Sequence, residues 1–205
     1  MLFFVALGEV CWQCNCTKGS LDLGMAYTNV RADAPWRSTK FTTLPWSVVP
    51  TFCHCRGFDI RMISADLLHS FHLGTGRDLI GSCMKILVQQ RYWPGSNIDK
   101  SLARATVQLR RYAKDRRLSL TVKRLSKQNL TWASDAFPEM KCKGYDTYII
   151  LAWLCYEMEM APPTSVEPSK QLMLDQLVLC VWAADSWVRL LTTSGTFLTE
   201  LQASS

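Results

Sequence analysis

The sequence predicts an α+β protein that is rich in helix. The first quarter of the chain is irregular and is interrupted by glycine and proline, and a short segment of alternating apolar residues follows at 59–65. Most of the remaining chain carries apolar residues at the three- and four-residue spacing of amphipathic helices. Of its 205 residues, 48% are hydrophobic and 20% are charged, which excludes a disordered or collagen-like protein.

We expect three regions. Residues 1–58 form a loop-rich segment that contains cysteines and begins with a strand or core segment at 1–10. Residues 59–160 form a strand followed by helices, and a proline-rich linker leads to a helical segment at 169–205.

The helical spacing sets the expected elements of the second and third regions. The expected helices cover 77–91, 97–117, 145–160 and 169–192, with a last helical turn at 197–201. Residues 118–132 fit either a strand or a short helix. The spacing over 97–117 turns Leu102, Ala105, Leu109 and Tyr112 inward, and Asn97 or Ser96 is the expected cap. Gly74, Gly76 and Gly81 are expected to break helices.

The positive charge is concentrated in one block. Residues 100–127 hold ten Lys and Arg residues and one acid, giving +9, while the rest of the chain sums to −3. Such a block indicates an anionic partner held by charge, and we expect non-specific contact with duplex DNA. The alternative is a solvated helix whose arginine stems cover apolar neighbours. The expected contact residues are Arg104, Arg110, Arg111, Lys114 and Arg117.

Four cysteines suggest a structural zinc site. Cys11 and Cys14 have zinc-knuckle spacing, and Cys53 and Cys55 flank a histidine. Zinc takes four nitrogen or sulfur ligands in tetrahedral geometry. The alternative is a set of thiols without metal in a loop-rich region. With no export signal and no apolar run of about 20 residues, we expect an intracellular protein without membrane contact, the nucleus being one option.

Asp66 follows the alternating segment 59–65, and His69 and His72 follow Asp66 at helical spacing. A carboxylate at the end of a strand is a frequent Mg²⁺ ligand in phosphoryl-transfer sites. The alternative is that Asp66 caps the following helix, because Asp is among the residues most favoured at that position.

Four blocks of sequence carry a resemblance to a known family. In order they are C-W-Q-C at 11–14, A-P-W-R at 34–37, I-S-A-D-L-L-H-S-F-H-L-G-T-G-R-D-L at 63–79 and P-E-M-K-C-K-G-Y-D-T at 138–147. The third resembles the D-x-x-H…L-G…(R/K)-D-L pattern of DDE-type transposases of the CACTA and Plavaka-like groups and their transposon-derived relatives. The first two are similar to the C-x2-C insertion between the first and second catalytic acids of those proteins.

The resemblance implies a partial RNase H-like domain in which Asp66 is the second metal-binding acid and His69 its companion histidine. The first acid is expected before the cysteine insertion, where Glu9 is the sole acid. The candidates for the third acid are Glu157, Glu159 and Glu139. Because two-metal catalysis needs carboxylates on both ions, we expect an N-terminally truncated, catalytically inactive, transposon-derived fragment.

Two other functions stay open. One is a non-enzymatic, zinc-stabilised module whose helices dock a protein partner. The other is an active nuclease, which would use Mg²⁺.

Overall fold

The computed structural model describes residues 14, 16–17, 24–39, 48–59, 66–132 and 137–194. The chain divides into two units, Met1–Ala65 and Asp66–Ser205. The second unit therefore joins the two helical regions, 59–160 and 169–205, that the sequence pattern separates. The segments expected at 1–10, 60–65 and 197–201 lie outside the described residues.

The α+β prediction is wrong, because the described part of the chain contains helices and no sheet. Its β-type pairing is one isolated parallel bridge between Thr17 and Ala26. No sheet of an RNase H-like domain is therefore present in the described residues. Alternation of apolar residues indicates which side of an extended segment faces the core. It does not indicate whether a second strand pairs with that segment to form a sheet.

The first unit holds two short 3₁₀ helices, η1 (Pro35–Thr39) and η2 (Thr51–His54). The indole N–H of Trp36 donates to the Asn29 carbonyl at 2.8 Å. The Arg37 guanidinium lies over the Trp36 ring, 4.9 Å from its centre. Side-chain hydrogen bonds and ring contacts therefore fix this segment locally.

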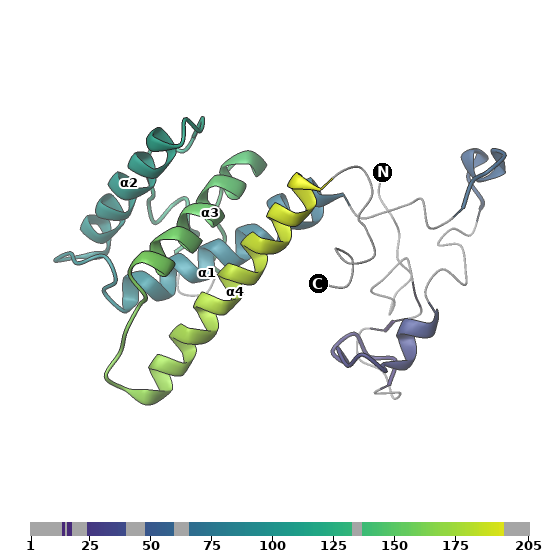
Figure 1. Ribbon diagram of the computed structural model, residues 1–205, viewed down its shortest axis with the longest axis horizontal. Coiled ribbons are helices and arrows are strands. Elements are labelled where there is room, and N and C mark those ends of the chain that lie inside the picture. The colour runs from purple at the N-terminus through teal and green to yellow at the C-terminus, as the bar shows by residue number, and fades with distance from the viewer. Residues whose placement is uncertain are drawn as a thin grey trace. The chain divides into compact units, whose positions relative to one another are not determined.

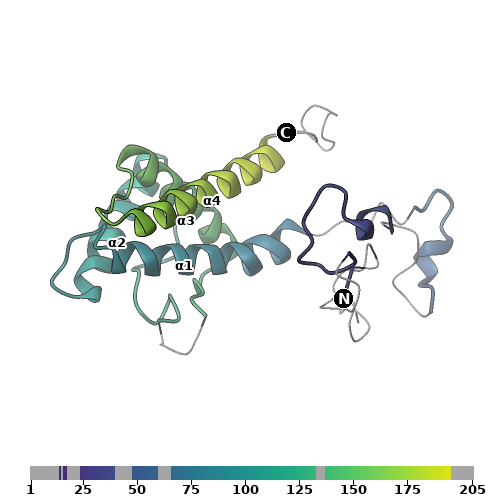
Figure 2. The ribbon, with the colours of Figure 1, turned by 90° about the horizontal axis from the view of Figure 1, so that it is seen from below.

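The second unit is built around one buried helix. It contains η4 (Leu68–Thr75, a π-helix), α1 (Gly76–Gln89), α2 (Ile98–Asp115), α3 (Gly144–Met160) and α4 (Pro168–Thr193). Helix α3 contacts η4, α1, α2 and α4, and it lies between α2 and α4 in Figures 1 and 2. All residues from 149 to 155 are buried, as expected for a helix that is apolar all round.

Helix α2 confirms the sequence prediction most closely. The Asn97 side chain accepts a hydrogen bond from the Lys100 backbone N–H at 2.9 Å and so caps the helix. The helix ends in a Schellman motif, in which Arg117 takes a left-handed conformation (φ 56°) and the Leu118 N–H donates to the Ala113 carbonyl at 2.8 Å. The predicted inward residues Leu102, Ala105, Leu109 and Tyr112 are all buried.

Residues 118–132, expected as a strand or a short helix, form neither: 127–131 are turns, and 118–126 have no regular structure. Leu118, Leu120 and Val122 alternate with exposed residues and pack against the core. The Leu125 N–H donates to the Thr106 hydroxyl at 2.9 Å, which ties the segment to α2. The segment is thus extended and fixed to helices on its inner side.

Gly81 does not break a helix but lies inside α1, where the chain 138–139 crosses closely. A Cβ atom there would lie 2.7 Å from the Glu139 nitrogen and 2.7 Å from the Pro138 carbonyl carbon. Glycine is needed at this position for backbone contact. None of the described helices has the length and apolar content required to cross a membrane.

Candidate nucleic-acid interface

The extended segment 118–126 borders a polar cavity of about 470 Å³. Its other wall is formed by residues 141–143 and 146, which lead into and begin α3. The basic side chains that line it are Lys123, Arg124, Lys141 and Lys143, accompanied by the polar residues Thr121, Ser126, Gln128 and Asn129.

A second cavity, of about 360 Å³, lies on the α2 side of the same segment. It shares Lys123, Arg124 and Ser126 with the first cavity and adds Arg110 from α2. We call the two cavities together the basic cleft. Because Lys123 and Arg124 line both cavities, the two cavities adjoin along the extended segment between α2 and the start of α3.

Hydrogen bonds hold both walls of the basic cleft in place. The Thr121 backbone N–H donates to Asp146 Oδ1 at 2.8 Å, and the Thr121 hydroxyl donates to Oδ2 of the same carboxylate. The Lys141 N–H donates to the Asn129 carbonyl at 2.6 Å. The loop cations therefore project from a backbone anchored to helices.

The charge of the basic cleft is strongly positive. Its five cations face two carboxylates, and both carboxylates are already engaged. Asp146 is 1% exposed and accepts from Thr121, while Asp99 pairs with the Lys127 ammonium at 3.2 Å. Positive charge in a concave surface focuses the field on an incoming anion.

The predicted basic residues of α2 are exposed, but Arg110 alone among them lines the cleft. Arg111 pairs with Asp115 at 3.7 Å. Because Arg117 lies beyond the end of α2 in a left-handed conformation, it does not continue the helical stripe. Arg104 and Lys114 are exposed elsewhere on the helix.

Lys141 and Lys143 were not among the predicted contact residues. They lie outside the basic block in sequence, and the fold brings them to Lys123 and Arg124. The signal that could have found them is their alternation, since K-C-K in an extended chain places both lysines on one side.

Asp66 and His69 lie together at the start of η4, and both are exposed. The Asp66 carboxylate interacts with the His69 imidazole and accepts from the Leu68 N–H at 2.8 Å. These hydrogen bonds, first that with His69, hold the pKa of Asp66 below its usual value. His72 is instead buried against Phe71 and Tyr148, and burial lowers its pKa.

The structure separates Asp66 from the expected third acid. Leu68 lies against Gly144 at the beginning of α3, whereas Glu157 lies in its last turns, about 20 Å away along the helix. Two catalytic metal ions would be about 4 Å apart. The Glu157 carboxylate accepts from the Trp153 indole at 3.1 Å, and burial raises its pKa.

The other candidates for the third acid are also engaged. Glu139 forms an ion pair with Arg77 at 2.7 Å, and Glu159 accepts from the Cys155 thiol at 3.5 Å. In the described ranges, no group of three or more His, Cys, Asp or Glu side chains is arranged to hold a metal ion.

The described part of the expected zinc site does not form a ligand set. Cys14 is buried, Cys53 is half-buried and Cys55 is exposed, while Cys11 lies outside the described residues. Desolvation, and then the neighbouring Cys55, raise the pKa of Cys53. The zinc hypothesis stays a prediction.

Comparison with protein-family models, with curated proteins and with solved structures gives no match to this chain.

Proposed function

We propose that the helical unit 66–194 binds duplex DNA without sequence preference, through the basic cleft. The observation that carries this proposal is the meeting of Lys123, Arg124, Lys141 and Lys143 around one polar cavity. Lysine, arginine and small polar side chains are the groups that contact phosphate oxygens, which position a duplex and carry no sequence information.

The lining of the cleft favours a duplex over a single strand. No aromatic side chain is among the described residues that line its two cavities. Proteins that hold single strands combine positive charge with aromatic platforms on which bases stack. A cleft that offers charge and hydroxyl groups instead fits the outer face of a phosphate backbone.

The proposed role is binding without catalysis. It is supported by the distance between Asp66 and Glu157 along α3, which separates Asp66 from the third acid expected from the transposase resemblance. A DNA ligand would also place the chain in an intracellular compartment that contains DNA.

The test is the salt dependence of binding to a labelled duplex of about 20 base pairs, measured by fluorescence anisotropy. Five phosphate contacts give a slope of log K against log salt of about −4.5, so affinity falls roughly 500-fold between about 50 and 200 mM salt. The double variant Lys141→Ala/Lys143→Ala reduces the steepness by nearly two units. Duplexes of different sequence bind alike.

The matched control is Arg104→Ala/Arg111→Ala, which removes the same charge from exposed positions of α2 outside the cleft. It is expected to change the slope by less than about half a unit. Absence of binding at about 50 mM salt, or equal weakening by the control pair, refutes the proposal. Circular dichroism of each variant verifies that helix content is unchanged.

A further inference from the structure

Helix α4 presents apolar side chains on its outer face as well as on its inner face. Leu174, Leu177, Val181 and Val188 are buried against the core. Leu179 and Trp182 are also apolar, yet they are 61% and 51% exposed. A surface helix ordinarily has one apolar stripe and a polar opposite face, so the outer apolar residues are not explained by packing within this unit.

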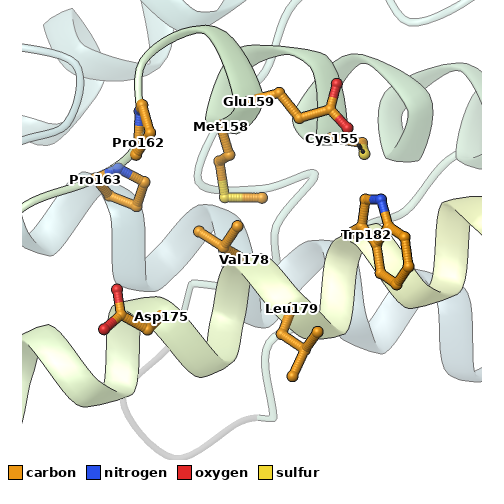
Figure 3. A pocket seen from close by; sticks show the side chains of 9 residues that line it. All are labelled: Cys155, Met158, Glu159, Pro162, Pro163, Asp175, Val178, Leu179 and Trp182. Atoms are coloured by element: carbon orange, nitrogen blue, oxygen red, sulfur yellow. Dashed lines mark hydrogen bonds between the residues drawn. The ribbon is translucent and has the colours of Figure 1, made fainter.

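These outer residues form one wall of a groove of about 300 Å³ between α3 and α4 (Figure 3). From α3, Met158 points across the groove toward Val178. Pro162 and Pro163 stand at one end, and Trp182 stands at the other. The groove therefore has an apolar floor and is closed at one end by the two prolines. At its other end it exposes a tryptophan, one of the residue types most enriched at binding hot spots.

Two carboxylates border this apolar groove, one on each helix. Glu159 accepts from the Cys155 thiol at 3.5 Å, and Asp175 accepts from the Gln171 amide at 2.7 Å. In contrast to Glu167, which pairs with Lys170 at 2.5 Å, neither forms an ion pair with a cation of the described chain. Their charge is available to a cation that approaches from outside.

We propose that the α3–α4 groove binds an amphipathic helix of a partner protein, with apolar anchors one turn apart and Lys or Arg beside them. The apolar floor takes the anchors, as in other helix-in-groove complexes. The partner's cations meet Glu159 and Asp175, and this complementarity sets orientation and excludes acidic helices. The groove uses none of the residues of the basic cleft, so the two ligands occupy separate sites.

The experiment titrates the full chain into a labelled synthetic peptide of about 16 residues. The peptide has Leu at positions i, i+3, i+4 and i+7, flanked by Lys. A second peptide carries Glu in place of Lys. The Lys peptide binds saturably and the Glu peptide at least tenfold more weakly, and Asp175→Asn reduces both affinity and its dependence on salt.

Leu179 and Leu172 provide a matched pair of variants. Both are leucines of α4 with nearly equal exposure, 61% and 60%, but Leu179 alone of the two lines the groove. Leu179→Ala weakens the Lys peptide about fivefold or more, whereas Leu172→Ala leaves affinity within about twofold. Because both side chains are exposed, neither variant is expected to unfold the chain.

Three results would overturn the proposal. They are equal binding of the Lys and Glu peptides, equal loss in Leu172→Ala and Leu179→Ala, and absence of saturable binding. Light scattering provides a further check, because dimers that dissociate in Leu179→Ala would assign the groove to a second copy of the chain instead.

Discussion

The Asp146 carboxylate ties the extended segment 118–126, which lines the basic cleft, to the buried helix α3. Replacing Asp146 tests whether it acts on DNA binding by holding this segment in place or by its negative charge. Asp146 receives two hydrogen bonds from Thr121. A hydrogen bond to a charged group contributes about 1.5–3 kcal/mol, and water can reach the exposed Thr121 afterwards. We therefore expect Asp146→Ala to lower the free energy of unfolding by about 3 kcal/mol, and Thr121→Val, which keeps the backbone hydrogen bond, by about 1.5 kcal/mol.

The direction in which Asp146→Ala changes DNA affinity distinguishes a positioning role of Asp146 from a simple charge effect. Removing a negative charge from a basic cleft would by itself strengthen binding, as is expected for Asp99→Ala in the second cavity. If Asp146 is instead the tether that positions Lys123 and Arg124, Asp146→Ala weakens binding and reduces the steepness of the salt slope by up to about two units.

The assays are urea unfolding followed by circular dichroism, and anisotropy of a labelled duplex over a range of salt. Asp115→Ala is the control for stability, because this exposed carboxylate pairs with Arg111 at 3.7 Å and should contribute less than about 0.5 kcal/mol. The reasoning is refuted if Asp146→Ala binds DNA more tightly than the parent chain, or if its unfolding free energy changes by less than about 1 kcal/mol.

Three further outcomes are expected. Gly81→Ala lowers the unfolding free energy by about 2 kcal/mol in urea, because its Cβ would meet backbone at 2.7 Å; a change below about 0.5 kcal/mol would contradict that contact. Burial raises the pKa of Asp185, which is 2% exposed in the apolar stripe of α4, and outweighs the opposing effect of its ion pair with the exposed Arg189 at 2.6 Å. Protonation of Asp185 stabilises the fold fully below the ordinary Asp pKa, and this stabilisation is lost as pH rises through the raised pKa. Asp185→Val therefore raises the unfolding free energy by about 2 kcal/mol near pH 7 and by less near pH 4. Equal effects at both pH values would count against this. Chain purified under reducing conditions carries about one zinc per molecule by mass spectrometry, and Cys14→Ser removes it; undiminished zinc in that variant would exclude Cys14 as a ligand.

The helices of the second unit could be predicted because their apolar spacing and their packing agree. In α2, Leu102 and Leu109 recur at helical spacing, Asn97 caps the first turn, and both signals are local in sequence. The same local information misled at residues 118–126, where a two-residue alternation marks an extended chain on a helical core. Whether such a chain finds a neighbouring strand depends on residues far away in sequence.

The place of the candidate site in the fold was not predicted from the sequence. The charge block predicted an anionic partner that is contacted by basic residues along one face of a helix. These residues do not form such a face, since Arg117 follows the end of α2 and Arg111 pairs with Asp115. Lys141 reaches the basic cleft because its backbone bonds to Asn129, a tertiary contact. The K-C-K alternation places Lys141 and Lys143 on one side of the chain but does not indicate which surface of the fold they reach.

The enclosure of α3 has a consequence for the synthesis of the chain. One side of this helix is covered by α4, which is completed more than thirty residues after α3 ends. At a synthesis rate of about 5–20 residues per second, this apolar side of α3 stays uncovered on the nascent chain for roughly two to seven seconds. During that interval Cys155 and Met158, which lie on the side of α3 that meets α4 and are buried in the finished fold, are exposed on a helix of the kind that chaperones hold.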